Sequence, residues 1–116
     1  MNWYLAKMVY RIICGDGQHL AQFDEQLRLV EAGDKEDAFE KAADMGRKEE
    51  DSFYNQQAQL VRWQFVAVPE LYPLTDLIDG AEICSRIKEV ENAEAYITFV
   101  QQRAAYIQRE KAFLLS

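Results

Sequence analysis

Apolar and polar residues alternate along three stretches of the chain, and this pattern predicts β-strands. Residues 3–14 (WYLAKMVYRIIC) carry aromatic and β-branched residues on both sides of a two-residue period, which is typical of a long strand with both faces largely covered. Residues 22–31 (QFDEQLRLVE) alternate more cleanly and predict a half-exposed strand. Residues 59–68 (QLVRWQFVAV) predict a third strand, with Arg62 and Gln64 among the apolar residues of one side.

A fourth, shorter strand is predicted at residues 81–87 (AEICSRI). Pro69 and Pro73 precede it, and proline lacks the main-chain N–H and constrains the residue before it. We therefore expect the segment ELYPLTDLIDG, between the third and fourth strands, to be irregular.

Helical spacing marks two further segments. Residues 34–51 begin with Asp34 as a candidate N-cap, and small or apolar residues such as Ala38 and Ala42 then recur on one face. Residues 92–114, capped by Asn92, carry a main apolar stripe. Its members are Ala93, Tyr96, Ile97, Val100, Ala104 and Ile107.

The last helix carries a second apolar stripe, formed by Phe99, Tyr106 and Phe113. Together the two stripes cover more of the helix surface than a monomer of 116 residues needs for its core. The sequence therefore predicts a homodimer in which Phe99, Tyr106 and Phe113 make contacts.

The element order β-β-α-β-β-α predicts an α+β fold, built as a four-stranded antiparallel sheet with two helices mainly on one face. The length of 116 residues predicts a single domain spanning residues 1–116. The other face of the sheet would stay partly apolar through Trp3, Leu5 and other strand residues. Such a face is typical of a partner-binding surface.

The segment CGDGQH, residues 14–19, gathers two glycines, a carboxylate, a thiol and the single histidine. Glycine and aspartate suit a hairpin turn between the first two strands. A phosphate-binding loop would need a helix after the glycines, whereas a strand follows here. The spacing of Cys14, Asp16 and His19 does not match a metal site, so the turn interpretation is favoured and no cofactor is expected.

The net charge of −7 is concentrated in residues 16–51, which hold twelve acidic and five basic residues. This balance disfavours nucleic-acid binding, which needs Lys and Arg to neutralise phosphates. No apolar run approaches the ~20 residues that span a bilayer, and the N-terminus lacks a signal-peptide pattern. We expect a cytoplasmic protein without membrane association, in which Cys14 and Cys84 are reduced thiols.

Most of the chain resembles a family of small bacterial proteins that is catalogued only as a domain of unknown function. The resemblance is carried by WYLAKMVYRI, FDEQLRLVEA, RWQFVAVPELYPL and DGAEICSRI, in this order. It implies a bacterial, cytoplasmic α+β domain. It supplies no catalytic residues.

Four charged residues lie among apolar neighbours in the predicted strands: Glu25, Arg62, Glu82 and Arg86. An unpaired buried charge is costly, so these residues are expected either to form ordinary ion pairs or to line a polar groove, with Trp63 and Tyr10 as possible walls. A groove would suit an anionic or zwitterionic ligand held by the arginines. Glu25 with Glu82 is the one carboxylate pair that could serve acid–base hydrolysis.

Two functions fit these features. The first is a non-enzymatic, dimeric binding or protein-interaction module, whose acidic segment selects a basic partner. One version of it is an immunity or antitoxin-type protein that masks a basic nuclease. The second is a small-molecule-binding protein or weak hydrolase that uses the Glu/Arg cluster, and the sequence favours the first.

Overall fold

The computed structural model describes residues 1–115, with side chains described for residues 1–110, and the chain divides into two compact units. Unit 1 comprises Met1–Cys84 and unit 2 begins at Ser85. Unit 1 holds all the strands and the first helix, and unit 2 holds the second helix. The single domain expected from the chain length stays a prediction.

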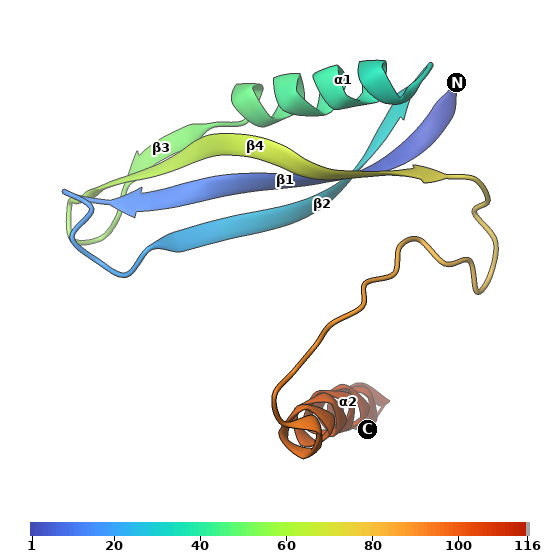
Figure 1. Ribbon diagram of the computed structural model, residues 1–116. Helices are drawn as coiled ribbons and strands as arrows, with labels where there is room; N and C mark the ends of the chain where they lie inside the picture. Colours follow the sequence, from blue (N-terminus) through green and yellow to red (C-terminus); the bar gives the residue numbers. More distant parts are fainter. Residues whose placement is uncertain (116) are drawn as a thin grey trace. The chain divides into compact units, whose positions relative to one another are not determined.

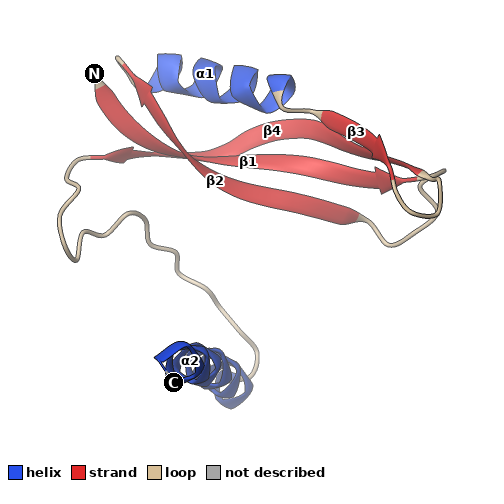
Figure 2. Cartoon of the chain, turned by 180° about the vertical axis from the view of Figure 1, so that it is seen from behind, coloured by secondary structure: helices blue, strands red, loops and turns tan. Residues whose placement is uncertain are grey.

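Unit 1 is a four-stranded antiparallel sheet with one helix along one face (Figure 1). The strands are β1 (Asn2–Cys14), β2 (Gln22–Ala32), β3 (Asp51–Tyr54) and β4 (Leu60–Leu74), arranged in the order β2-β1-β4-β3. Helix α1 (Lys35–Lys48) covers one face of the sheet, as the view from behind also shows (Figure 2). With α2 (Ala93–Leu115) in unit 2, the order β-β-α-β-β-α and the α+β fold class are confirmed.

The first two predicted strands form a hairpin whose turn is CGDGQH. Gly15 and Gly17 have φ angles of +61° and +82°, in the left-handed region that glycine tolerates best. The Gln18 N–H donates to Asp16 Oδ1 at 3.0 Å, which closes the turn. His19 Nε2 accepts from the Cys14 N–H at 2.9 Å, so the ring donates through Nδ1 to the Leu20 carbonyl at 2.7 Å. The histidine therefore holds the turn, and the turn interpretation is confirmed.

The fourth strand was predicted at residues 81–87, and this prediction was wrong. Residues 75–92 contain neither helix nor strand, and the fourth strand is β3, in a segment expected to be a helix end and loop. A tight turn joins β3 to β4, in which Asn55 and Gln59 pair through main-chain atoms and Ala58 has a φ of +61°. Strand β3 therefore pairs with the adjacent start of β4 as a local hairpin.

The two prolines do not end β4, which continues to Leu74. The prediction that the segment from Glu70 onward is irregular was therefore wrong for residues 70–74. Strand β3 pairs only with Leu60–Trp63, so the rest of β4 has β1 on one side and a free edge on the other. Proline is tolerated at such an edge because no neighbouring strand needs its N–H. The pairing with β1 is irregular between Lys7 and Val9, opposite Pro69. A β-bulge at this point accommodates the first proline.

Helix α1 begins as predicted, because Asp34 Oδ1 accepts the Asp37 N–H at 2.8 Å. It ends at Lys48, three residues earlier than expected, since Asp51 already starts β3. Its buried face consists of Ala38, Ala42 and Gly46. These small residues allow the helix to lie close to the sheet. The core between them is formed by buried residues, chiefly Tyr4, Ala6, Met8, Tyr10, Val30, Ala32 and Val68.

Unit 2 contains helix α2, which is capped by Asn92 as predicted. Asn92 Oδ1 accepts the Ala95 N–H at 3.0 Å. Phe99 and Tyr106 are both more than half exposed, and the side chain of Phe113 lies outside the described residues. In the part of the chain that the structure describes, no helix is long and apolar enough to cross a membrane.

Candidate interaction surface

The two faces of the sheet in unit 1 differ in what covers them. Alternate residues of β1, from Tyr4 to Tyr10, face α1 and are buried. The residues between them point to the other face, on which residues 1–84 place no helix, and we call this surface the open face. On β1 it comprises Trp3, Leu5, Lys7, Val9, Arg11 and Ile13; on β2, Phe23, Glu25, Leu27, Leu29 and Glu31; on β4, Arg62, Gln64, Ala67, Glu70, Tyr72 and Leu74.

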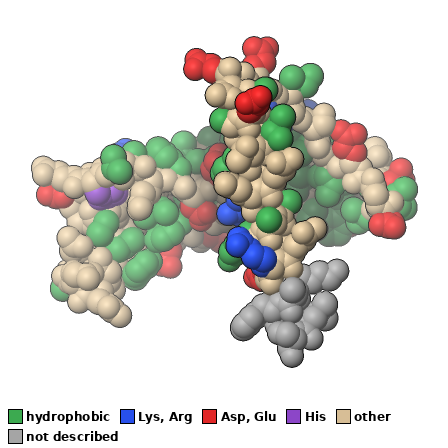
Figure 3. Space-filling model, turned by 90° about the horizontal axis from the view of Figure 1, so that it is seen from below, with side chains coloured by type: hydrophobic (Ala, Val, Ile, Leu, Met, Phe, Trp, Pro, Cys, Tyr) green, Lys and Arg blue, Asp and Glu red, His purple; other side chains and the backbone are tan. Residues whose placement is uncertain are grey.

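Large apolar side chains lie exposed on the open face. Leu27, Leu29 and Phe23 of β2 are 64%, 56% and 54% exposed, and Leu5 and Val9 of the neighbouring strand are half-buried. In the view from below, apolar side chains gather along these strands (Figure 3). A contiguous apolar patch on a sheet face is typical of a surface that binds another protein.

An ion cluster lies in the middle of the open face. Lys7 Nζ contacts Glu25 Oε1 at 2.9 Å and Glu70 Oε2 at 3.1 Å, which joins the three longest strands. Tyr72 Oη donates to the other oxygen of Glu70 at 2.5 Å. The Lys7 side chain is only 17% exposed, whereas that of Glu25 is 59% exposed. Glu25 therefore presents a charged acceptor that an incoming protein could use.

The two carboxylates change the titration of Lys7. The hydrogen bond to Glu25, followed by the one to Glu70, raises the pKa of the lysine above its ordinary value of 10.5. Partial removal from water acts in the opposite direction and is outweighed. Lys7 therefore stays charged at any pH near neutrality.

The predicted polar cluster is distributed over three parts of the chain. Glu25 and Arg62 share the open face, on the two sides of β1, at positions opposite Val9 and Ile13. Trp63 points to the other face, where its ring stacks with Phe53 at a centroid distance of 5.9 Å.

The other two predicted site residues lie beyond the sheet. Glu82 belongs to the irregular end of unit 1, and Arg86 to unit 2. Sequence reasoning missed Lys7 and Glu70 as the partners of Glu25. Their positions within a two-residue period on β1 and β4 were the available signal, but the prediction ended the third strand before Glu70.

A second polar row lies on the covered face, at the C-terminal end of α1. Asp24 Oδ2 accepts from Trp63 Nε1 at 3.1 Å and from Gln26 Nε2 at 2.7 Å. Arg28 then contacts Gln26 at 3.2 Å and pairs with Glu49 at 2.9 Å. This row ties β2 to β4 and to the end of α1, so it is explained by the fold.

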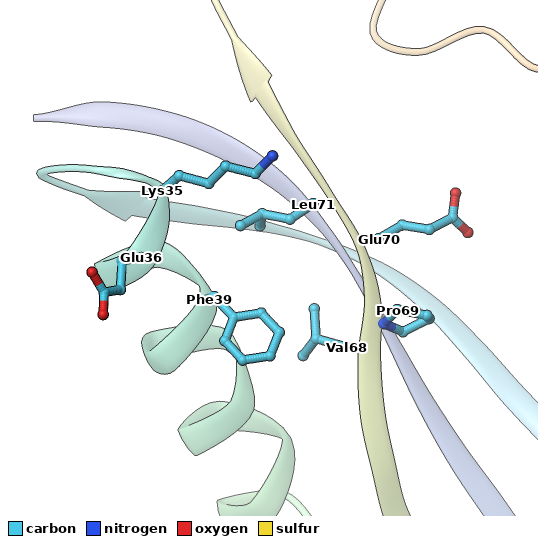
Figure 4. Close-up of a pocket in the computed structure, with 7 residues that line it drawn as sticks. All are labelled: Lys35, Glu36, Phe39, Val68, Pro69, Glu70 and Leu71. Atoms are coloured by element: carbon cyan, nitrogen blue, oxygen red, sulfur yellow. The ribbon is translucent and has the colours of Figure 1, made fainter.

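A hollow of about 610 Å³ lies between the start of α1 and β4 (Figure 4). Phe39, Val68 and Leu71 line it with apolar surface, and the Lys35 chain extends over it. Glu36 and Glu70 also line it, and their carboxylates point away from Phe39 and Val68 (Figure 4).

The residues with nucleophilic or metal-binding chemistry are held by structural contacts or lie apart. Cys14 Sγ contacts Gln59 Oε1 at 3.4 Å, and Cys84 is exposed. Among the described residues, no three His, Cys, Asp or Glu side chains lie close enough together to hold a metal ion.

Residues 3–85 match the family described as Domain of unknown function (DUF4288). The chain belongs to this family. The DUF4288 match begins within β1 and ends one residue beyond unit 1, so it comprises nearly all of the sheet, α1 and the irregular end of unit 1. Helix α2 lies outside the matched residues. No curated protein and no solved structure matches the chain.

The resemblance to a family of unknown function is thereby confirmed. The open face, with its ion cluster Lys7–Glu25–Glu70, lies within the residues that define the family match. None of the residues of the open face belongs to the buried core of unit 1.

Proposed function

We propose that this protein is a non-enzymatic interaction module that binds a partner protein on the open face of its sheet. The observation that carries the proposal is the exposed apolar row of Phe23, Leu27 and Leu29 beside a half-buried ion cluster. Apolar area supplies affinity, and a fixed charged group at its centre supplies orientation and specificity.

The partner is expected to bring apolar side chains and a basic group. Glu25 is an exposed carboxylate in the apolar surround, and a lysine or arginine of the partner would complement it. Helix α1 carries as many basic as acidic residues, but exposed acidic residues flank it on both sides: Asp34, Glu49, Glu50 and Asp51. Their field would speed the encounter with a basic protein. This supports the version in which the module masks a basic protein in the cytoplasm of a bacterium.

Site-specific photocrosslinking in the host cell tests the proposal. A photoreactive amino acid at Leu5, in the middle of the open face, is expected to capture a defined partner. The same group at Glu40, exposed on α1, is the matched control and is expected to capture it weakly or not at all.

Binding of the purified partner then gives the quantitative test. Leu5→Ser removes apolar area at the centre of the open face and is expected to weaken binding at least about 10-fold, because central contacts dominate interface energetics. Glu40→Gln is expected to leave affinity within about 2-fold, as for peripheral charges. Equal crosslinking from both positions would contradict the proposal. So would an unchanged affinity of a folded Leu5→Ser variant for the partner.

A further inference from the structure

Strand β2 is a long free edge of the sheet. It pairs with β1 on one side, and the strand order β2-β1-β4-β3 leaves its other side unpaired within residues 1–84. Its eleven residues contain no proline, whereas the free part of β4 carries Pro69 and Pro73. Proline at an edge strand hinders pairing with another strand. The free edge of β4 is therefore protected in this way, whereas the edge of β2 is not.

A lysine of α1 shows which main-chain groups point to the free edge of β2. Lys41 Nζ donates to the Glu31 carbonyl oxygen at 2.8 Å. The Gly15 N–H donates to the Leu60 carbonyl, so the even-numbered residues of β1 point to β2 and pair with its even-numbered residues. In an antiparallel strand the N–H and C=O of one residue point to the same side, and the side alternates along the chain. The free groups therefore belong to Phe23, Glu25, Leu27, Leu29 and Glu31, whose side chains lie on the open face.

We propose that a second copy of this chain pairs with this edge, β2 against β2, about a twofold axis that passes through Gln26. An axis perpendicular to the sheet keeps both α1 helices on one side and both open faces on the other. Two four-stranded sheets then form one sheet of eight strands. The partner in this dimer is a second copy of the chain in a defined register, and neither is part of the proposed function.

Charge complementarity selects the register. With the axis at Gln26, Asp24 lies directly opposite the partner's Arg28, and symmetry makes this pair twice. Opposite charges at directly opposed positions stabilise an antiparallel pair. Shifting the axis by one residue, to Leu27, would place Asp24 against the partner's Val30 instead.

The same register satisfies the free main-chain groups. Glu25 exchanges two hydrogen bonds with the partner's Leu27, and Phe23 does so with the partner's Leu29. Symmetry brings the total to about eight main-chain hydrogen bonds. Glu31, whose carbonyl already accepts from Lys41, lies just outside the paired segment. On the open face, Phe23 meets the partner's Leu29, so apolar side chains line the joint.

Two charge-reversal variants test the register in the full-length protein. Asp24→Arg places like charges opposite each other twice, and so does Arg28→Asp. Each variant alone is expected to raise the dimer dissociation constant at least about 10-fold in sedimentation equilibrium, since two cross-strand pairs turn from attraction to repulsion. An equimolar mixture of the two variants restores an Arg–Asp pair at both positions. Native mass spectrometry of the mixture is expected to show the mixed dimer in excess over both homodimers.

Controls separate loss of the interface from loss of the fold. Asp24 also accepts from Trp63 and Arg28 also pairs with Glu49, so thermal melting of each variant must show a folded chain. Arg47→Asp makes the same charge change on α1 and is expected to leave the dimer intact. Leu27→Pro removes one free N–H at the edge and is expected to give a monomer without charge change.

The outcomes distinguish this inference from other dimers and from the proposed function. A wild-type chain that is monomeric at ~100 μM would overturn it, and so would a dimer that survives both reversals but is lost in Phe99→Glu on α2. A mixture without mixed dimers would reject the register. Partner capture through Leu5 that persists in Asp24→Arg would show that the proposed function stands without the dimer.

Discussion

Alternate residues of β1 enter two different environments, and the difference separates what folds unit 1 from what is left for binding. On the covered face, Ala6, Met8 and Tyr10 are at most 1% exposed beneath α1, and within residues 1–84 no charged residue is fully buried with them. On the open face, Lys7 forms ion pairs among apolar neighbours that keep much of their surface in water. The side chains of β1 thus alternate between the core and the open face, with a period of two residues.

The covered face lies close to α1 because the residues that this helix buries against it are all small. Ala38 and Ala42 are fully buried, and Gly46 lies against the ring of Phe65. Few large side chains are fully buried, namely Tyr10, Met8 and Val30. Stability is therefore concentrated in a few contacts, whereas the apolar side chains of the open face contribute little to it.

The largest effect is expected for Met8→Ala. Truncating a fully buried methionine leaves a cavity and costs about 2–5 kcal/mol of unfolding free energy. Leu27→Ala, on the open face, is the matched control and is expected to change the unfolding free energy by less than about 0.5 kcal/mol. Urea denaturation of both variants measures the difference. If Met8→Ala and Leu27→Ala lost the same unfolding free energy, the open face would have to be covered in solution.

A smaller loss is expected for Gly46→Ala. Replacing glycine by alanine inside a helix normally gains about 1 kcal/mol, but here the new Cβ would lie 2.3 Å from the Phe65 ring. Overpacking costs about 1–3 kcal/mol, so the net change is expected to be a loss. Adding Phe65→Leu should recover stability relative to Gly46→Ala alone. If Gly46→Ala alone were more stable than wild type, the Phe65 ring would have to move away from the new Cβ without a loss of unfolding free energy.

The hydroxyl of Tyr10 is expected to contribute about 0.5–1.5 kcal/mol. It donates to the Gly46 carbonyl at 2.8 Å, one of the last helix carbonyls, which lack a partner within α1. Burial, followed by the charge of Glu49, raises the pKa of this phenol above its ordinary value of 10.0. The hydroxyl therefore contributes its full share of the unfolding free energy below pH 10, and this share is lost as the pH rises through the raised pKa. Tyr10→Phe should be less stable at neutral pH and should lose less stability on going to high pH.

The partly apolar open face was predictable from the sequence, through Trp3 and Leu5, but the contrast within β1 and the extent of β4 were not. The two-residue period of residues 3–14 predicted a strand with both faces largely covered, whereas only the side toward α1 is buried. The proline rule failed at Pro69 and Pro73 because it depends on whether a neighbouring strand needs the N–H, which is set by the length of β3. Ending the strand early removed Glu70 from the sheet, and with it the ion cluster of the candidate surface.

The smallest of these effects concerns the charge of Lys7 on the open face. Its raised pKa means that the lysine contributes stability below pH 10.5, and that this contribution is lost as the pH rises through the raised value. Lys7→Met should therefore flatten the fall in unfolding free energy between pH 9 and pH 12, measured by urea denaturation at each pH. Tyr10→Phe removes the phenol's part of the same fall from the covered face, so the double variant should be flatter than either single variant. Should Lys7→Met leave the alkaline slope unchanged, the lysine would not be held by Glu25 and Glu70 in solution. The open face would then present three separate charges rather than one fixed cluster, and the specificity assigned to it would have to come from its apolar residues.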